Sequence, residues 1–320
     1  MKEKINFRNR TNEKLTLEEG FKKFIAMKKA MKLSERTIDF YECCYKYFTA
    51  FCDGETLAEN VSRETIINYL VFMNETKSHL SEQTVDSYMR GTKPFIKYLI
   101  DSGYTKDFEF PTIKKSEPLK ETYTDSQLDK LLVKPDIKNC HFSEYRDWVI
   151  ICHILATGNR VGTICNIKNC DVDFSSHEIN LRVVKNRKAY IIPISTKYEK
   201  VLKEFMSYRG GKPEDYLFCN VYQEPLTISS VQNSIRKYNT KRGVSRFSIH
   251  AFRHTFAKKW IMNGGDIFRL QQMLGHSSLD MVKKYVAMFR EDLKKDFDEF
   301  SPLDNIDFIF EPRKSLKINR

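Results

Sequence analysis

The sequence predicts a mainly α-helical protein of two domains, with a helical bundle first and an α+β domain with a small antiparallel sheet after it. Three observations support this prediction. The chain has 320 residues, which is longer than most single domains. Residues 15–103 have the 3.6-residue periodicity of amphipathic helices. Residues 172–195 change to the β-branched, partly alternating pattern of strands.

The first domain, residues 15–103, is expected to be a bundle of four helices preceded by a short extension at 1–14. Each helix follows a residue whose side chain can act as an N-cap. These four residues are Thr16, Ser34, Ser62 and Ser81. Pro94 is expected to kink or break the last helix, because proline lacks the N–H that a helix interior needs.

A segment with two prolines, mixed charge and little periodicity follows at 104–121. This composition is typical of an interdomain linker. The second domain is expected to span 122–300, and its first helix begins at Thr124 or Asp125. A tail at 301–320 completes the chain.

Within the second domain, the apolar stretch YRDWVIICHILATG predicts a helix that ends at Gly158. The stretches EINLRVV and KAYIIPIS predict a β-hairpin whose polar turn contains residues 185–187. After Thr196 the pattern is helical again to about Leu293. The second domain is therefore expected to consist of helices around one small sheet.

Composition excludes several classes of protein. Hydrophobic residues make up 41% of the chain, enough for packed cores. No apolar run approaches the roughly 18–20 residues of a membrane helix, and the basic N-terminus lacks the apolar segment of a secretory signal. The eight cysteines include no C-x-x-C pair, which favours reduced thiols over a structural zinc site. A cytoplasmic protein without membrane partners is expected.

The net charge of +12 is concentrated in one part of the chain. Residues 180–259 hold 17 basic and 5 acidic side chains, which equals the whole excess. Such a local excess favours a face that binds a polyanion, although an ordinary solvated surface is the alternative.

Polar residues of the second domain form a candidate site. Arg160 follows the helix-ending glycine in ATGNRVGT, and Lys185 lies in the hairpin turn. His250 and Arg253 are three residues apart in IHAFRHTFA, which places them on one face of a helix.

A further segment, LGHSSLDMVKKYV, places His276 nine residues before Tyr285. Each residue alone has an ordinary explanation. Arg160 could cap a helix, Lys185 could be a simple turn lysine, and histidines near apolar residues are usually part of the core. Tyr285 is one of 16 tyrosines.

Together, however, these residues resemble the active site of the tyrosine recombinases, the phage-integrase family. That family orders its site as Arg, hairpin Lys, His-x-x-Arg, Gly-His and Tyr. The matching residues here are Arg160, Lys185, His250, Arg253, His276 and Tyr285. The resemblance covers nearly the whole chain and implies a SAM-like core-binding bundle followed by the tyrosine recombinase catalytic fold.

At one position the chain departs from the family pattern, and at another it offers two candidates. Many family members have glutamate three residues after the first arginine, where this chain has Thr163. That glutamate usually supports the site rather than taking part in the chemistry, so the change bears on local packing. Lys188 also lies in the hairpin turn, and it is the alternative to Lys185 as the catalytic lysine.

The resemblance implies metal-independent DNA cleavage without a cofactor. Tyr285 would attack a DNA phosphate and form a 3′-phosphotyrosyl link, leaving a free 5′-hydroxyl. Arg160 and Arg253 would bind the non-bridging oxygens, as guanidinium forks do. Lys185 would protonate the leaving group. His250 would assist proton transfer with Tyr285, and His276 would hydrogen-bond the phosphate.

The implied partners are double-stranded DNA at specific recombination sites, three further copies of the chain in a synaptic tetramer, and directionality or DNA-bending factors. With 14 residues before the bundle, an additional arm-binding domain is not expected. The tail at 301–320 is expected to dock on a neighbouring subunit, with packing on its own domain as the alternative.

A phage or mobile-element integrase is the favoured function. An Xer-like resolvase and a catalytically inactive DNA-binding regulator on the same fold are the alternatives, and a type IB topoisomerase shares the chemistry. A metal-dependent nuclease is disfavoured: His250 and His254 have zinc-helix spacing, but Ala251 replaces the glutamate of H-E-x-x-H and Arg253 would repel a cation.

Overall fold

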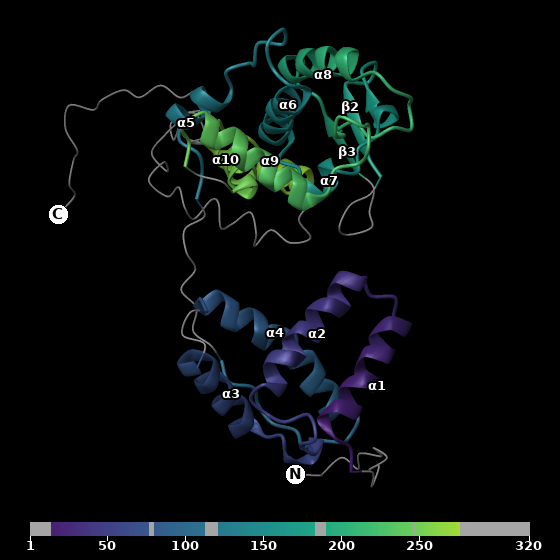
Figure 1. The fold of residues 1–320 in the computed structure, drawn as a ribbon, viewed down its shortest axis with the longest axis vertical. Coiled ribbons are helices and arrows are strands. Elements are labelled where there is room, and N and C mark those ends of the chain that lie inside the picture. The colour runs from purple at the N-terminus through teal and green to yellow at the C-terminus, as the bar shows by residue number, and fades with distance from the viewer. Residues whose placement is uncertain (1–13, 77–79, 113–120, 183–189, 246–247, 276–320) are drawn as a thin grey trace, which may run out of the picture. The chain divides into compact units, whose positions relative to one another are not determined.

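The computed structural model describes five stretches of the chain, namely residues 14–76, 80–112, 121–182, 190–245 and 248–275. The chain divides into two compact units, 1–117 and 118–320, and the division falls within the segment predicted as a linker. Each unit has its own hydrophobic core, and Figure 1 shows the helices and strands of each unit. Across the described stretches, no helix combines the length and the apolar character needed to cross a membrane.

The first unit contains the predicted four helices. They are α1 (Leu17–Ala30), α2 (Glu35–Thr49), α3 (Arg63–Thr76) and α4 (Glu82–Asp101), with a 3-10 turn, η1 (Ala58–Asn60), before α3. All four predicted N-caps accept a hydrogen bond from the backbone N–H three residues on. At Thr16 the cap is a reciprocal capping box with Glu19.

Helices α2 and α4 pack closely where Gly91 faces Cys44. A Cβ atom at Gly91 would lie 2.2 Å from the Cys44 Sγ, so only glycine allows this approach. Of the two effects predicted for Pro94, a break of α4 is wrong, because the helix continues through this residue, and a kink stays a prediction. Proline costs the helix a hydrogen bond, but the turns around it bury Phe95, Ile96 and Leu99 in the core of the unit.

The first residues of the predicted linker pack on the helical unit. The hydroxyl of Thr105 donates a hydrogen bond of 2.6 Å to the Ala58 carbonyl. Tyr104, Phe108 and Phe110 lie against the same core. Tyr104 and its neighbours therefore extend this unit beyond residue 103.

The second unit is built around α6, which is buried on almost every side. Its sequence is apolar around the whole helix rather than along one stripe, as expected of a central helix. α6 packs against α8, α9 and α10, and it lies between α8 and the α9–α10 pair in Figure 1. The helices of this unit are α5 (Asp125–Leu131), α6 (Phe142–Thr157), α7 (Val161–Ile164), α8 (Thr196–Arg209), α9 (Ile228–Lys241), α10 (Ile249–Met262) and α11 (Ile267–Leu274).

A three-stranded antiparallel sheet of order β1-β2-β3 lies at one side of this unit. Its strands are β1 (Val172–Asp173), which follows the 3-10 turn η2 (Asn169–Asp171), β2 (Glu178–Leu181) and β3 (Tyr190–Pro193). The predicted hairpin is confirmed, because Leu181 pairs with Tyr190 and Glu178 pairs with Pro193. Its turn at 185–187 lies outside the described residues.

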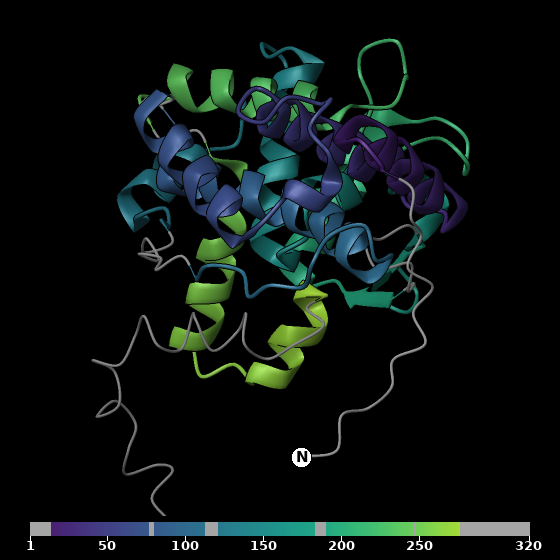
Figure 2. The same cartoon turned by 90° about the horizontal axis from the view of Figure 1, so that it is seen from below.

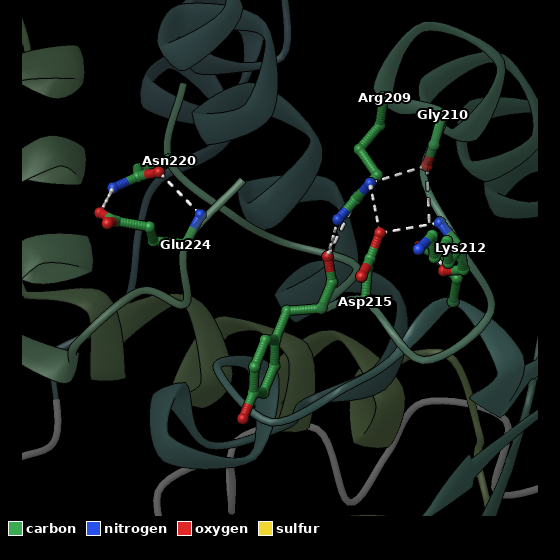
Figure 3. A network of polar contacts seen from close by, with 8 residues as sticks. Arg209, Gly210, Lys212, Asp215, Asn220 and Glu224 are labelled. Atoms are coloured by element: carbon green, nitrogen blue, oxygen red, sulfur yellow. Dashed lines mark hydrogen bonds and ion pairs between the residues drawn. The ribbon is translucent and has the colours of Figure 1, made fainter. Parts of the chain in front are cut away.

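The helical stretch predicted after Thr196 is interrupted between α8 and α9. Residues 210–227 are irregular, and Figure 3 shows the polar contacts that hold them. The buried Arg209 guanidinium donates to the carbonyls of Tyr216, at 2.8 and 3.0 Å, and Gly210, at 2.7 Å. Further along, the Asn220 amide donates to Glu224. The order of this segment therefore depends on specific side chains rather than on periodicity.

Helices α10 and α11 are joined by a four-residue turn, visible in Figure 2. Gly264 adopts a positive φ of 76° in this turn. The indole N–H of Trp260 donates to the Asp266 carbonyl at 3.0 Å and fixes the reversal. The turn directs α11 back so that its last residue, Leu274, reaches the start of α7.

Candidate active site

Two arginines from distant parts of the sequence meet at one carbonyl oxygen. Arg160, which directly precedes α7, donates from Nη1 to the Leu274 carbonyl at 3.2 Å. Arg253 of α10 donates from Nη2 to the same oxygen at 2.7 Å, and from Nη1 to the Gly158 carbonyl at 2.6 Å. The structure thus brings together the end of α6, the start of α7, the middle of α10 and the end of α11.

Gly158 makes this convergence possible. It ends α6 in the left-handed conformation, with φ of 67°. A Cβ atom there would lie 2.5 Å from the Phe256 ring and 2.8 Å from a Leu274 methyl group. Only glycine fits in this space, so the chain can end α6 here with Phe256 and Leu274 packed against it. The same ending places the Gly158 carbonyl within hydrogen-bond distance of Arg253.

His250 lies near both guanidinium groups. It occupies the first turn of α10, one turn before Arg253, and it is exposed to solvent. Partial desolvation, then the positive charges of Arg253 and Arg160, lower the pKa of His250 below its usual 6.5. The neutral imidazole is therefore the dominant form at neutral pH, which suits a group that exchanges protons with a tyrosine.

The other three predicted site residues, Lys185, His276 and Tyr285, lie outside the described residues, as does Lys188. Residues next to two of them are described. Tyr190 begins β3, just after the hairpin turn, and Gly275 directly precedes His276. A Cβ atom at Gly275 would be 3.5 Å from the Tyr190 hydroxyl, so the base of the hairpin and the end of α11 are in contact.

Three polar residues that were not predicted from the sequence form a hydrogen-bonded group next to Arg160 in the structure. Asn159 is fully buried, and it accepts a hydrogen bond from the Tyr190 hydroxyl at 3.3 Å. Its amide nitrogen lies 3.0 Å from Nε2 of His153, which is buried in α6. The available signal was a histidine inside the apolar run WVIICHILATG and an asparagine directly before the arginine.

Thr163, the residue at the usual glutamate position, is buried in α7. Its backbone N–H donates to the Arg160 carbonyl at 2.9 Å. A small hydroxyl-bearing residue is therefore accommodated in this first turn, and the turn itself holds the Arg160 backbone.

The geometry suits the binding of an anion. Among the residues that the structure describes, no carboxylate forms an ion pair with Arg160, whose described hydrogen bond goes to a carbonyl. A carbonyl oxygen carries only a partial charge and does not neutralise a guanidinium. The guanidinium groups of Arg160 and Arg253 meet at one carbonyl oxygen beside a neutral histidine, and such an arrangement can bind a phosphate through its non-bridging oxygens.

Comparison with known proteins agrees with this chemistry. The tyrosine recombinase of Pseudothermotoga lettingae is 28% identical over 262 residues, covering 80% of this chain and 88% of the relative. Tyrosine recombinase XerC of Leptospira interrogans is 26% identical over 298 residues, covering 90% and 94%.

Two solved structures share the fold. The Tn1549 transposon integrase in complex with a circular intermediate DNA has a TM-score of 0.70 at 20% identity, over 85% of this chain and 95% of that one. A lambda integrase tetramer bound to a Holliday junction has a TM-score of 0.69 at 17% identity, over 87% and 79%.

The sequence profile of the phage integrase family matches residues 121–291, more than half of the chain. That range contains all six residues of the predicted site. The chain therefore belongs to the phage integrase family, the tyrosine recombinases.

Proposed function

We propose that this chain cuts and rejoins DNA at specific sites, with Tyr285 as the nucleophile. The observation that carries the proposal is the convergence of Arg160 and Arg253 on the Leu274 carbonyl, two residues before His276. Attack by Tyr285 on the scissile phosphate would form a 3′-phosphotyrosyl bond and break the bond to the 5′-oxygen. The covalent link conserves the energy of the broken phosphodiester for rejoining.

The remaining residues complete the reaction without a cofactor. Arg160 and Arg253 would neutralise the charge that develops on the non-bridging oxygens. Neutral His250 would accept the proton of the tyrosine, and Lys185 would deliver one to the departing 5′-oxygen. His276 would add a hydrogen bond to the phosphate. In the second half of the reaction, a 5′-hydroxyl of a partner duplex attacks the phosphotyrosyl bond.

The basic block at 180–259 is proposed to contact the DNA backbone. Arg236 and Lys237 are exposed on α9, and within the described residues neither forms an ion pair with a carboxylate. Such uncompensated charges bind phosphates without reading sequence. Buried Arg146 holds this helix in place, because it bonds both Asp147 of α6 and Ser234 of α9.

A tetramer on two DNA duplexes is the proposed working assembly, because strand exchange needs four cleavage sites and a lambda integrase has been solved as a tetramer on a Holliday junction. Directionality or DNA-bending factors would control its outcome, and it would act on cytoplasmic DNA at the nucleoid. Integration of a mobile element is favoured by the similarity to the Tn1549 transposon integrase. Similarity to XerC proteins favours an Xer-like resolvase as the second candidate.

The test uses a nicked duplex that carries the recombination site, recovered from DNA flanking the gene. The nick lets the short cleaved strand diffuse away, so that the covalent protein–DNA adduct accumulates. Wild type should form an adduct that resists denaturation, with or without EDTA, and Tyr285→Phe should form none. An undiminished adduct in Tyr285→Phe, or binding without any adduct in wild type, would refute the proposal.

A further inference from the structure

A histidine that the proposed reaction does not use is buried at the centre of the second unit. His153 in α6 has no solvent exposure, and burial lowers its pKa to about 3. Its Nδ1 lies 2.6 Å from the Tyr198 hydroxyl and its Nε2 lies 3.0 Å from the Asn159 amide nitrogen. An amide nitrogen can only donate, so Nε2 accepts from Asn159. Because the ring is neutral, its one proton is on Nδ1, which donates to the Tyr198 hydroxyl.

The opposite side of the Asn159 side chain is held as well. Its Oδ1 accepts a hydrogen bond from the Tyr190 hydroxyl, at 3.3 Å. Its backbone N–H donates to the hydroxyl of Thr157, which in turn donates to the His153 carbonyl at 2.7 Å. Asn159 is thus fixed by side chains from α6 and β3, through both its side chain and its backbone.

Arg160, the next residue, needs such support. It is not inside a helix: with φ of −74° and ψ of 147° it is the extended residue between the end of α6 and the start of α7. Its side chain is long and partly exposed, and its described hydrogen bond to the Leu274 carbonyl is 3.2 Å. The direction of this side chain therefore depends on how firmly its backbone is held.

We propose that Asn159 is a positioning residue for Arg160, clamped between Tyr190 and the buried His153 so that the Arg160 guanidinium faces the scissile phosphate. The inference rests on the proposed function. Tyr190 also connects the clamp to the rest of the site, because its ring lies against Gly275 and its hydroxyl lies near the charges of Arg253 and Arg160. A rigid, buried hydrogen-bonded network is what holds a reactive group to within a fraction of an ångström.

The experiment compares cleavage of two nicked duplexes by the full-length chain under single-turnover conditions at saturating DNA. One duplex has the natural scissile phosphate. In the other, a methyl group replaces one non-bridging oxygen, which removes the negative charge that a guanidinium must neutralise. A defect in Arg160 placement should therefore slow cleavage of the natural phosphate more than cleavage of the methylphosphonate.

Asn159→Ala should slow adduct formation on the natural phosphate by about 10- to 100-fold, the usual cost of a misplaced group. On the methylphosphonate the loss should fall below about threefold, because the charge requirement is gone. Tyr190→Phe, which removes one hydroxyl and keeps the ring, should show a smaller loss with the same preference. If Asn159→Ala does not fold, Tyr190→Phe alone tests the positioning role.

Tyr238→Phe is the matched control. It removes another buried hydroxyl, which donates to the Leu131 carbonyl at 3.0 Å and has no hydrogen bond to Asn159, Arg160 or Arg253 among the described residues. It should slow both substrates equally or not at all. Equal slowing of both substrates by Asn159→Ala and Tyr190→Phe, or no slowing in folded protein, would overturn the positioning role. If wild type forms no adduct on either duplex, the proposed function itself fails.

Discussion

Leu274 contributes a backbone carbonyl to the site, and both Arg160 and Arg253 donate hydrogen bonds to it. The two cationic groups therefore lie close together before any DNA is bound. Neighbouring like charges repel and raise the free energy of the free protein, and a phosphate relieves that repulsion on binding. His250 experiences the same field, because its pKa is lowered by desolvation and by both charges.

The titration of His250 measures this field directly. In the folded protein without DNA, its pKa measured by NMR should lie below 6.5, with the resonance assigned by its loss in His250→Gln. Arg160→Gln should raise that pKa, because it removes one of the two charges. The folded chain binds this proton less tightly than the unfolded chain, so the corresponding stability is lost as pH falls through 6.5 and below. A pKa above 6.5, or no change in Arg160→Gln, would contradict the arrangement.

Among the secondary-structure elements, the end of α6 is the one whose conformation affects the site most, because Gly158 both ends the helix and bonds Arg253. The sequence correctly predicted that this helix stops at Gly158, because a glycine after an apolar run is a local signal. The stop has a second function that no local pattern reveals, since the Gly158 carbonyl bonds Arg253 of α10. The irregular segment at 210–227 was not predicted for a similar reason: the carbonyls that Arg209 bonds are fixed only in the folded chain.

Two glycines, Gly158 and Gly243, both have a positive φ but differ in the space around them. Substitution of each by alanine therefore distinguishes the cost of backbone strain from the cost of overpacking. Gly158 has φ of 67° and no room for a Cβ atom, whereas Gly243 has φ of 68° and nothing within 4 Å. Gly243→Ala should lower the free energy of unfolding by about 1 kcal/mol, the cost of the left-handed conformation. Gly158→Ala should lower it by about 2–4 kcal/mol, because overpacking adds to that cost.

Chemical denaturation with matched m-values checks both variants. Equal losses of stability would mean that the space around Gly158 is not as tight as described. A loss for Gly158→Ala that exceeds that for Gly243→Ala would support the close approach of Phe256 and Leu274.

For the whole molecule, the sequence predicts the fold more completely than it predicts the site. Helices and the hairpin follow from local periodicity, the caps follow from the residue type before each helix, and the predicted site residues follow from an ordered pattern along the chain. The clamp of Asn159, His153 and Tyr190 was not predicted, because each residue is unremarkable alone and Tyr190 is 31 residues from Asn159 in the sequence. The end of α6 places His153 beside Asn159, and the fold brings the Tyr190 hydroxyl of β3 to the oxygen of the same amide.

Charge distribution is also a property of the whole chain. The double variant Arg236→Ala/Lys237→Ala should weaken DNA binding and reduce the slope of log affinity against log salt by about 2, since each phosphate contact contributes roughly 0.9. The matched control is Lys134→Ala/Lys203→Ala, whose charges already pair with Glu204 and Glu199. DNA-binding titrations of both double variants at several salt concentrations give the two slopes. Equal slopes would argue against DNA contacts through α9.

Tyr285 is the residue through which the chain is proposed to become covalently attached to DNA. The most direct measurement is mass spectrometry of the adduct after nuclease and trypsin digestion. The tryptic peptide YVAMFR, residues 285–290, contains a single tyrosine. We expect a nucleotide 3′-phosphate on that peptide and on no other. A nucleotide on any other residue, or a cleaved strand without a protein attachment, would contradict it.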